Sequence, residues 1–230
     1  MSVIQKNINK DLIQFNEMSM PSSIIDLNNS ELSSSNFDIL VSYSDYNLSI
    51  NQSILNGYLN FMIERKYDGK IGILKIPGGA FELPLLSSKI IRKYKPKLCL
   101  IIGCIVRGES QHYEFLASTT TNAIRNVAFE NNIPVLNGVL TVESDQQAID
   151  RAGKKLNKGA EYADASLGIL NFSTVLARTN ELGGIMHSDV FLDTKFEDLK
   201  FLGSTISEFT FVNILNSSDT LASYPKDDKP

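Results

Sequence analysis

The sequence predicts an α/β protein, a three-layer sandwich whose central parallel sheet is covered by helices on both faces. Apolar runs of strand length alternate with helix-like segments from residue 37 to about residue 170. The run at residues 97–106 is the most apolar in the chain and is typical of a strand buried on both faces. Strands that alternate with helices are joined by right-handed crossovers, which produce a parallel sheet.

The expected elements follow one another in a regular order. We expect strands at residues 39–41, 71–76, 97–106 and 134–140. We expect helices at residues 50–62, 83–91, 113–131, 145–153 and 159–170. The first helix illustrates the pattern, because Ile50, Ile54 and Tyr58 place apolar side chains on one face at helical spacing.

Extensions flank this domain on both sides. Residues 1–36 are rich in Ser, Asn and Asp and are expected to form a weakly ordered N-terminal arm. The domain itself is expected to span residues 37–170, followed by a C-terminal extension of unassigned role at residues 171–230. In that extension we expect one or two strands within residues 201–215 and a polar, disordered tail at residues 217–230.

Composition argues against several classes of protein. The 230 residues carry a formal net charge of −4, so the positive surface typical of nucleic-acid binding is missing. No apolar run reaches the roughly eighteen residues that a membrane span requires. The N-terminus lacks the apolar stretch of a secretory signal, so we expect a cytoplasmic protein.

The two cysteines, Cys99 and Cys104, lie in the same expected strand. Their odd separation places the side chains on opposite faces of that strand, so they cannot form a disulfide with each other. We interpret both as core residues of a protein from a reducing compartment.

Three loops follow three of the expected strands, at residues 44–47, 78–82 and 107–112. Each contains residue types that can hold a ligand or react with it. In an open parallel sheet, ligands bind beyond the carboxyl ends of the strands. The sequence therefore predicts a binding site where these three loops meet.

The third loop has the features of an anion site with an adjacent proton carrier. Gly108 lets the backbone approach a ligand, and the amides of Glu109 and Ser110 precede a helix whose N-terminus attracts anions. His112 stands beside this loop, and histidine is the side chain that most often moves protons in catalysis. Taken alone, the loop is better explained as a turn with an exposed histidine. The other histidine is His187, outside the α/β domain, so no His-based metal site is expected.

Four other residues can be interpreted in two ways. Tyr46 and Phe81 could stack on a planar heterocycle or could be core aromatics. Arg151 and Lys158 lie on or beside expected helices, where isolated cations are usually solvated surface residues. The residues themselves leave these alternatives open.

Several collinear segments resemble the lumazine synthase (6,7-dimethyl-8-ribityllumazine synthase) family. They are residues 77–84, 103–114, 137–141, 147–153 and 157–159. The resemblance implies a flavodoxin-like sandwich over residues 37–170. It also implies an enzyme that condenses 5-amino-6-(D-ribitylamino)uracil with 3,4-dihydroxy-2-butanone 4-phosphate, releasing phosphate and water, without a metal or redox cofactor.

The resemblance implies which residues bind the uracil substrate. Tyr46 would stack on the pyrimidinedione ring, at a position where the family has an aromatic side chain. Ala80, Phe81 and Glu82 would line the ribityl chain, with Glu82 accepting hydrogen bonds from its hydroxyls. These roles are carried over from the family by position.

The same resemblance implies the remaining contacts within one subunit. Ile105 and Val106 would touch the ring, and Glu109 and Ser110 would supply hydrogen-bond donors to the phosphate. His112 would move protons during imine formation, phosphate elimination and ring closure, for which one near-neutral base is useful.

In the family the active site lies between neighbouring subunits, so the resemblance implies a homo-oligomer. Asn137, Arg151 and Lys158 would come from the adjacent chain, with Arg151 holding the phosphate through two hydrogen bonds. The expected partners are small-molecule substrates and further copies of this chain. The sequence leaves open a pentamer, a pair of pentamers or an icosahedral shell.

Three features depart from the family pattern. The segment 77–82 carries one glycine more than usual, Asp45 stands where an arginine is common, and Asn137 replaces a frequent aromatic. The altered glycine segment and the two extensions motivate an alternative, a non-catalytic, ring- or shell-forming paralogue that binds flavin-like heterocycles. A third alternative is a flavodoxin-like binding module, although no Ser/Thr-rich phosphate loop follows the first strand.

Overall fold

The computed structural model describes residues 10–15, 21–28 and 36–181, with side chains as far as Ala177. The chain forms two units, residues 1–170 and residues 171–230, and the sheet belongs to the first. The strands expected within residues 201–215 and the tail expected at residues 217–230 lie outside the described residues.

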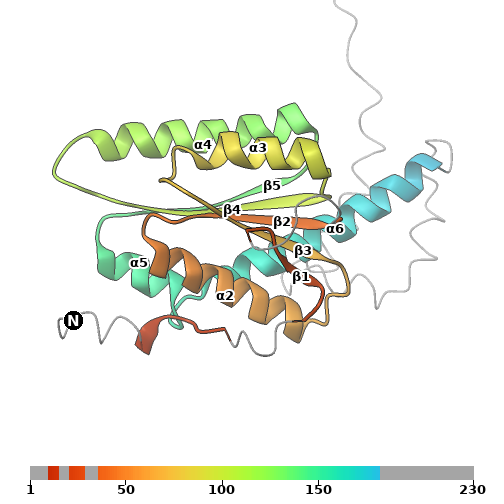
Figure 1. The fold of residues 1–230 in the computed structure, drawn as a ribbon, viewed down its shortest axis with the longest axis horizontal. Coiled ribbons are helices and arrows are strands. Elements are labelled where there is room, and N and C mark those ends of the chain that lie inside the picture. The colour runs from red at the N-terminus through yellow and green to blue at the C-terminus, as the bar shows by residue number, and fades with distance from the viewer. Residues whose placement is uncertain (1–9, 16–20, 29–35, 182–230) are drawn as a thin grey trace, which may run out of the picture. The chain divides into compact units, whose positions relative to one another are not determined.

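A parallel sheet forms the centre of the first unit (Figure 1). In spatial order its strands are β1 (Ile24–Asp26), β3 (Ile71–Ile76), β2 (Ile39–Ser44), β4 (Leu98–Val106) and β5 (Val135–Val142). Each pair of neighbouring strands is parallel. Every residue of β4 except Val106 is buried, as the apolar composition of that run predicts.

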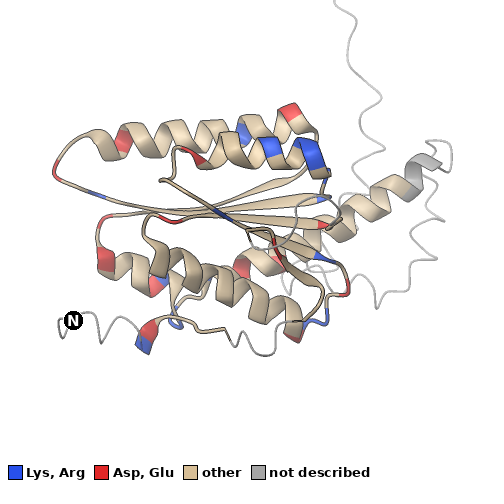
Figure 2. Cartoon of the chain, viewed as in Figure 1, with Lys and Arg blue, Asp and Glu red and all other residues tan. Residues whose placement is uncertain are grey.

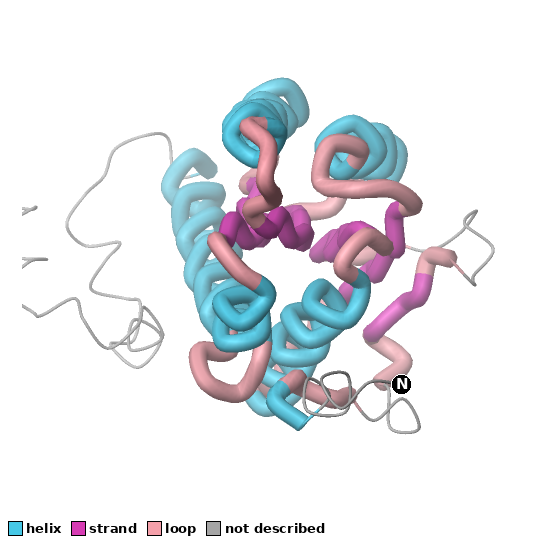
Figure 3. Tube along the Cα trace, turned by 90° about the vertical axis from the view of Figure 1, so that its left-hand side faces the viewer, coloured by secondary structure: helices cyan, strands magenta, loops and turns pink. Residues whose placement is uncertain are grey.

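Helices cover both faces of this sheet. They are α2 (Leu48–Glu64), α3 (Leu83–Tyr94), α4 (His112–Asn131), α5 (Asp145–Ala152) and α6 (Lys158–Glu181). Helices α2 and α5 pack on one face together with the first turns of α6, and helices α3 and α4 pack on the other (Figures 1 and 3). The predicted flavodoxin-like, three-layer α/β sandwich is therefore confirmed. No helix in the described part of the chain is long and apolar enough to span a membrane.

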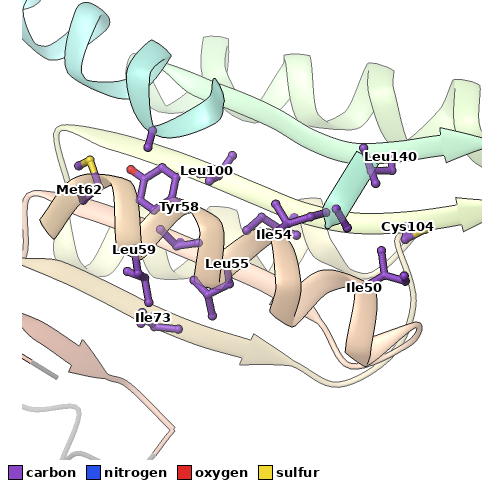
Figure 4. Close-up of a cluster of buried hydrophobic side chains, with 14 of the residues drawn as sticks. Ile50, Ile54, Leu55, Tyr58, Leu59, Met62, Ile73, Leu100, Cys104 and Leu140 are labelled. Carbon is purple, nitrogen blue, oxygen red and sulfur yellow. The ribbon is translucent and has the colours of Figure 1, made fainter. Parts of the chain in front are cut away.

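The apolar face of α2 fills one of the two cores (Figure 4). Ile54 and Tyr58 are fully buried and point toward the strands, where they share this core with Ile73 and Leu100. The spacing along α2 is the helical pattern visible in the sequence. The Tyr58 hydroxyl keeps a partner inside the core, because it donates to Ser166 Oγ at 3.1 Å.

The two cysteines lie on opposite faces of β4, as their spacing predicts. Cys99 belongs to the core beneath α3 and α4, whereas Cys104 belongs to the core beneath α2. Both are buried and unpaired. The strand therefore contributes one thiol to each core.

Several elements extend beyond their expected bounds, and two of them show a physical reason. The first predicted strand continues to Ser44, because the polar side chains at its end have partners inside the protein. Ser42 Oγ, for example, lies 2.6 Å from Ser87 Oγ. The last predicted helix continues to Glu181, since no glycine or proline interrupts the chain between residues 171 and 181.

Part of the N-terminal arm packs against the domain. β1 adds to the edge of the sheet beside β3, and Leu12 is buried in the α2 core. The Ile13 N–H donates to Ser53 Oγ at 2.9 Å. β1 was not predicted, because a strand of three residues is too short to show an alternating pattern.

Replacement of Ile54 by alanine should destabilise the fold by about 3 kcal/mol, because it removes a fully buried side chain from a packed core. Urea unfolding at a fixed protein concentration measures this loss. The matched control is Ile63→Ala on the same helix, where the side chain is 41% exposed and the loss should stay below about 0.5 kcal/mol. Equal losses in the two variants would contradict this assignment of the core.

Candidate active site

A pocket of about 730 Å³ opens at the edge of the sheet where the strands end. Figure 3 views this edge, where the connecting loops gather around the helix ends. The loops that follow β2, β3 and β4 line the pocket, together with the first residues of α4 and α5. The three loops expected from the sequence therefore meet in one site.

The pocket brings together most of the residues that the sequence singled out. Within one subunit its lining includes Tyr46, Ala80, Phe81, Glu82, Ile105, Val106, Ser110 and His112. Glu109 is exposed and does not line it. Asn137, Arg151 and Lys158 also lie outside the lining.

Two further polar residues line the pocket: Asn47, which lies in the first expected loop but was given no role, and Asp145, which was missed in the sequence. Asn47 is the N-cap of α2 and Asp145 is the first residue of α5, so both stand where a helix begins at the carboxyl edge. Asn47 Nδ2 also donates to the Cys104 carbonyl at 2.9 Å, which ties the first loop to β4. The rule that places ligands at this edge could have included these helix starts.

The first two loops are joined by hydrogen bonds at Gly78. Its N–H donates to Asp45 Oδ1 at 2.8 Å. Its carbonyl accepts from Ser44 Oγ at 2.6 Å and from the Tyr46 N–H at 3.2 Å. Gly78 has a φ of 105°, in the left-handed region that favours glycine. The loop that carries the additional glycine is therefore fixed to its neighbour.

The two aromatic side chains of these loops face solvent rather than the core. Tyr46 and Phe81 are 67% and 61% exposed, so the alternative that they are core aromatics is wrong. Next to Phe81, Glu82 Oε2 accepts from the Gly79 N–H at 2.7 Å. This bond uses one carboxylate oxygen and leaves Oε1 to accept from a ligand.

Arg107 anchors the start of the third loop. Its guanidinium forms ion pairs with Glu114 on α4 and with Glu143 after β5, and it lies 4.4 Å from the centre of the Tyr113 ring. The hydrogen bond from Arg107 holds the pKa of Glu114 below its usual value, and the same bond raises the pKa of Arg107. These contacts fix the first turn of α4, which begins at His112.

The N-terminus of α4 suits an anion. The Gln111 side chain at its N-cap makes no capping hydrogen bond, and the His112 N–H makes a long hydrogen bond of 3.4 Å to Ser110 Oγ. Apart from Gly108 and its two neighbours in the chain, no residue has a heavy atom within 4 Å of the position that a Cβ on Gly108 would take, so a ligand can approach the loop backbone. Ser110 and His112 line the pocket at this end. A phosphate would meet N–H donors and the positive end of the helix dipole here.

Three predicted residues lie outside the pocket of their own subunit. Arg151 Nη1 donates to the Gln147 carbonyl at 3.2 Å, and Lys158 forms an ion pair with Glu161. Asn137 is exposed on the edge strand β5. Within one subunit none of the three lines the pocket.

The pocket itself carries little positive charge. Among its described lining residues none is Lys or Arg, whereas Glu82 and Asp145 are acidic. Charges of both signs lie in the surrounding loops (Figure 2). Burial, together with the charge of Asp145, raises the pKa of Cys104 to about 12, so its thiol is protonated at neutral pH. In the part of the chain that the structure describes, no three potential metal ligands lie together.

The fold and the pocket define a class, the α/β proteins with a pocket at the carboxyl edge of a parallel sheet, the edge where such folds bind their ligands. Residues 36–174 match the model of one family in particular, described as 6,7-dimethyl-8-ribityllumazine synthase. The chain belongs to this family. The resemblance carried by the motifs at residues 77–84 and 103–114 is thereby confirmed.

Curated relatives agree with this membership. The 6,7-dimethyl-8-ribityllumazine synthase of Buchnera aphidicola subsp. Baizongia pistaciae is 35% identical over 144 residues, which are 61% of this chain and 90% of that protein. The Thermococcus kodakarensis enzyme of the same name is 36% identical over 126 residues, 55% of this chain and 80% of the relative. That of Yersinia pestis (strain Pestoides F) is 35% identical over 139 residues, 59% and 88% of the two chains.

Neither cysteine should react with a thiol reagent while the protein is folded. Burial raises the pKa of both thiols, that of Cys104 to about 12, so they stay protonated and shielded at about pH 8. Reaction with 5,5′-dithiobis(2-nitrobenzoate) should be negligible in buffer and should reveal both thiols after denaturation. The Cys104→Ser variant should reveal only Cys99. Labelling of the folded protein within minutes would contradict this burial.

Proposed function

We propose that this chain condenses 5-amino-6-(D-ribitylamino)uracil with 3,4-dihydroxy-2-butanone 4-phosphate to 6,7-dimethyl-8-ribityllumazine, in riboflavin biosynthesis. One observation carries the proposal. A single pocket combines exposed aromatic side chains, a carboxylate, and a helix N-terminus that begins at a histidine. These groups match the three chemical parts of the two substrates, which are a planar ring, a polyol chain and a phosphate. Membership of the family supports the same reaction.

The first two loops suit the uracil substrate. The exposed ring of Tyr46 offers a face on which a pyrimidinedione can stack. Ile105 and Val106 supply apolar contacts to the same ring. The ribityl chain would run along Phe81 and donate hydrogen bonds to Glu82 Oε1, because Oε2 is already engaged.

The third loop suits the phosphate and the proton transfers. The backbone at Glu109 and Ser110 and the first turn of α4 would donate hydrogen bonds to the phosphate. His112 would move the protons that imine formation, phosphate elimination and ring closure require. Alignment of the two substrates in one pocket would supply a further part of the acceleration.

The positive charge that the pocket lacks supports a shared active site. A leaving phosphate is stabilised by cations, yet the described lining of one subunit contains no Lys or Arg. We propose that Arg151, Lys158 and Asn137 of an adjacent subunit complete each pocket. Such a head-to-tail contact can close into a ring, and we propose a pentamer. The two unpaired, buried cysteines fit a cytoplasmic enzyme.

Purified full-length protein should form lumazine from the two substrates faster than the uncatalysed background, as followed by absorbance. The His112→Ala variant should lower kcat on the order of 100-fold, because a positioned acid or base is lost. Substitution of Lys97, an exposed cation remote from the pocket lining, by alanine is the control and should leave kcat unchanged. The absence of lumazine above background with the unaltered chain would refute the proposed function.

Two inactive variants should restore each other if the pocket is shared between subunits. Arg151→Ala alone should lose most activity, because the leaving phosphate loses its cation. Co-expression of Arg151→Ala with His112→Ala should recover about a quarter of the unaltered activity, since random assembly pairs an intact His112 with a neighbour's intact Arg151 at about that frequency. Activity that stays at the level of the single variants would exclude the shared site.

A further inference from the structure

Gly78 joins the two loops that are proposed to bind the uracil substrate. Both of its backbone polar groups bond to the preceding loop, the N–H to Asp45 Oδ1 at 2.8 Å and the carbonyl to Ser44 Oγ and the Tyr46 N–H. Asp45 is exposed, and in the described part of the chain its carboxylate forms no ion pair. In the described part of the chain, the Asp45 carboxylate therefore interacts with the Gly78 N–H, from which it accepts a hydrogen bond.

A second carboxylate holds the next amide of the same loop. Glu82 Oε2 accepts from the Gly79 N–H at 2.7 Å. Consecutive amides are thus held from both sides, by Asp45 before the loop and by Glu82 within it. Gly78 has a φ of 105°, which other residues rarely adopt, so this arrangement also favours a glycine. Phe81, which lines the pocket, lies in the sequence between Gly79 and Glu82, the two residues that this second bond joins.

We infer that Asp45 is a positioning residue that, together with the two bonds to the Gly78 carbonyl, fixes the separation between Tyr46 and Phe81. The inference rests on the proposed function, in which the heterocycle stacks on Tyr46 while the polyol chain runs along Phe81 to Glu82. A fixed separation selects substrates that carry both parts, a planar ring and a polyhydroxylated chain. The phosphate-bearing substrate binds at the third loop and does not depend on this separation.

The chemistry of the Asp45 side chain explains why two departures from the family pattern, the additional glycine in residues 77–82 and the aspartate at position 45, occur together. An additional residue in the loop brings an additional N–H donor, which is exposed and can bond to water or to an acceptor in the protein. A carboxylate at position 45 supplies that acceptor. The arginine that is common at this position has five N–H donors and no acceptor, so it could not bond to the Gly78 amide.

Steady-state kinetics of the full chain with each substrate varied in turn tests this role. Asp45→Ala should raise the KM for the uracil substrate by about three- to tenfold, the effect of one lost hydrogen bond. The KM for the butanone phosphate and kcat should stay within about twofold of their unaltered values, because the third loop does not bond to Asp45.

Three further variants separate positioning from a general structural effect. Asp45→Asn should keep the KM of the unaltered chain, because its amide oxygen still accepts from Gly78. Asp45→Arg lacks an acceptor and should behave as Asp45→Ala does, which repeats the test in a second variant. Asp68→Ala removes an exposed carboxylate before β3, at the opposite edge of the sheet, and should change neither KM. An unchanged KM in Asp45→Ala, or equal changes for both substrates, would overturn the inference.

Binding of the product gives a readout that does not require turnover. Fluorescence titration with 6,7-dimethyl-8-ribityllumazine should show about three- to tenfold weaker binding by Asp45→Ala and unaltered binding by Asp45→Asn. If the unaltered chain forms no lumazine, the proposed function fails, and this titration alone decides the inference. Equal affinities of the unaltered chain and Asp45→Ala, or no binding by the unaltered chain, would overturn it.

Discussion

The burial of β4 on both faces is the constraint on which the rest of the structure depends. A strand without a solvent-facing side needs a helical layer above and below it, and parallel neighbours need crossovers that run back over those layers. Each crossover brings the chain back to the edge of the sheet where the strands begin. All strands therefore run in the same direction, and β2, β3 and β4 end at the opposite edge, side by side. The pocket exists because three successive loops open at that edge. The apolar composition of residues 97–106 thus determines where the site lies, although most of its polar residues come from other segments.

The fold could be predicted because the side chains that become buried recur at regular spacing in the sequence. Ile54 and Tyr58 recur at helical spacing and are fully buried, and the two cysteines of β4 alternate between the two cores as their separation requires. β1 shows no such spacing, because three residues at a sheet edge are too few to define a period. The positions of the loops followed from the strands. The identity of the ligand did not follow from them, and it came from the collinear motifs shared with the family.

Polar contacts between loops could not be predicted in the same way. Arg107 contacts Glu114, Glu143 and Tyr113, and these contacts are exposed, so they impose no hydrophobic pattern. The bond between Asp45 and Gly78 likewise joins residues from two loops that only the folded sheet brings together. Each such bond contributes little to stability in water. These bonds matter because they set the geometry of the pocket, and the spacing of apolar residues in the sequence carries no information about them.

The charge of the third loop is the physical reason for proposing that a neighbouring subunit supplies the cation for the phosphate. Arg107 is the cation closest in sequence to Ser110 and His112, yet two carboxylates engage its guanidinium. What remains for the phosphate is the N-terminus of α4, and a helix dipole stabilises an anion by only about 0.3–1 kcal/mol at an exposed site. A bidentate arginine would add charge-assisted hydrogen bonds of roughly twice the ordinary strength. The loop therefore uses its own arginine to hold the helix start in place, and in the proposed assembly the neighbour's Arg151 supplies the charge. Arg107 cannot both hold the helix start and bind the phosphate. In the proposed assembly, two arginines from two subunits divide these tasks.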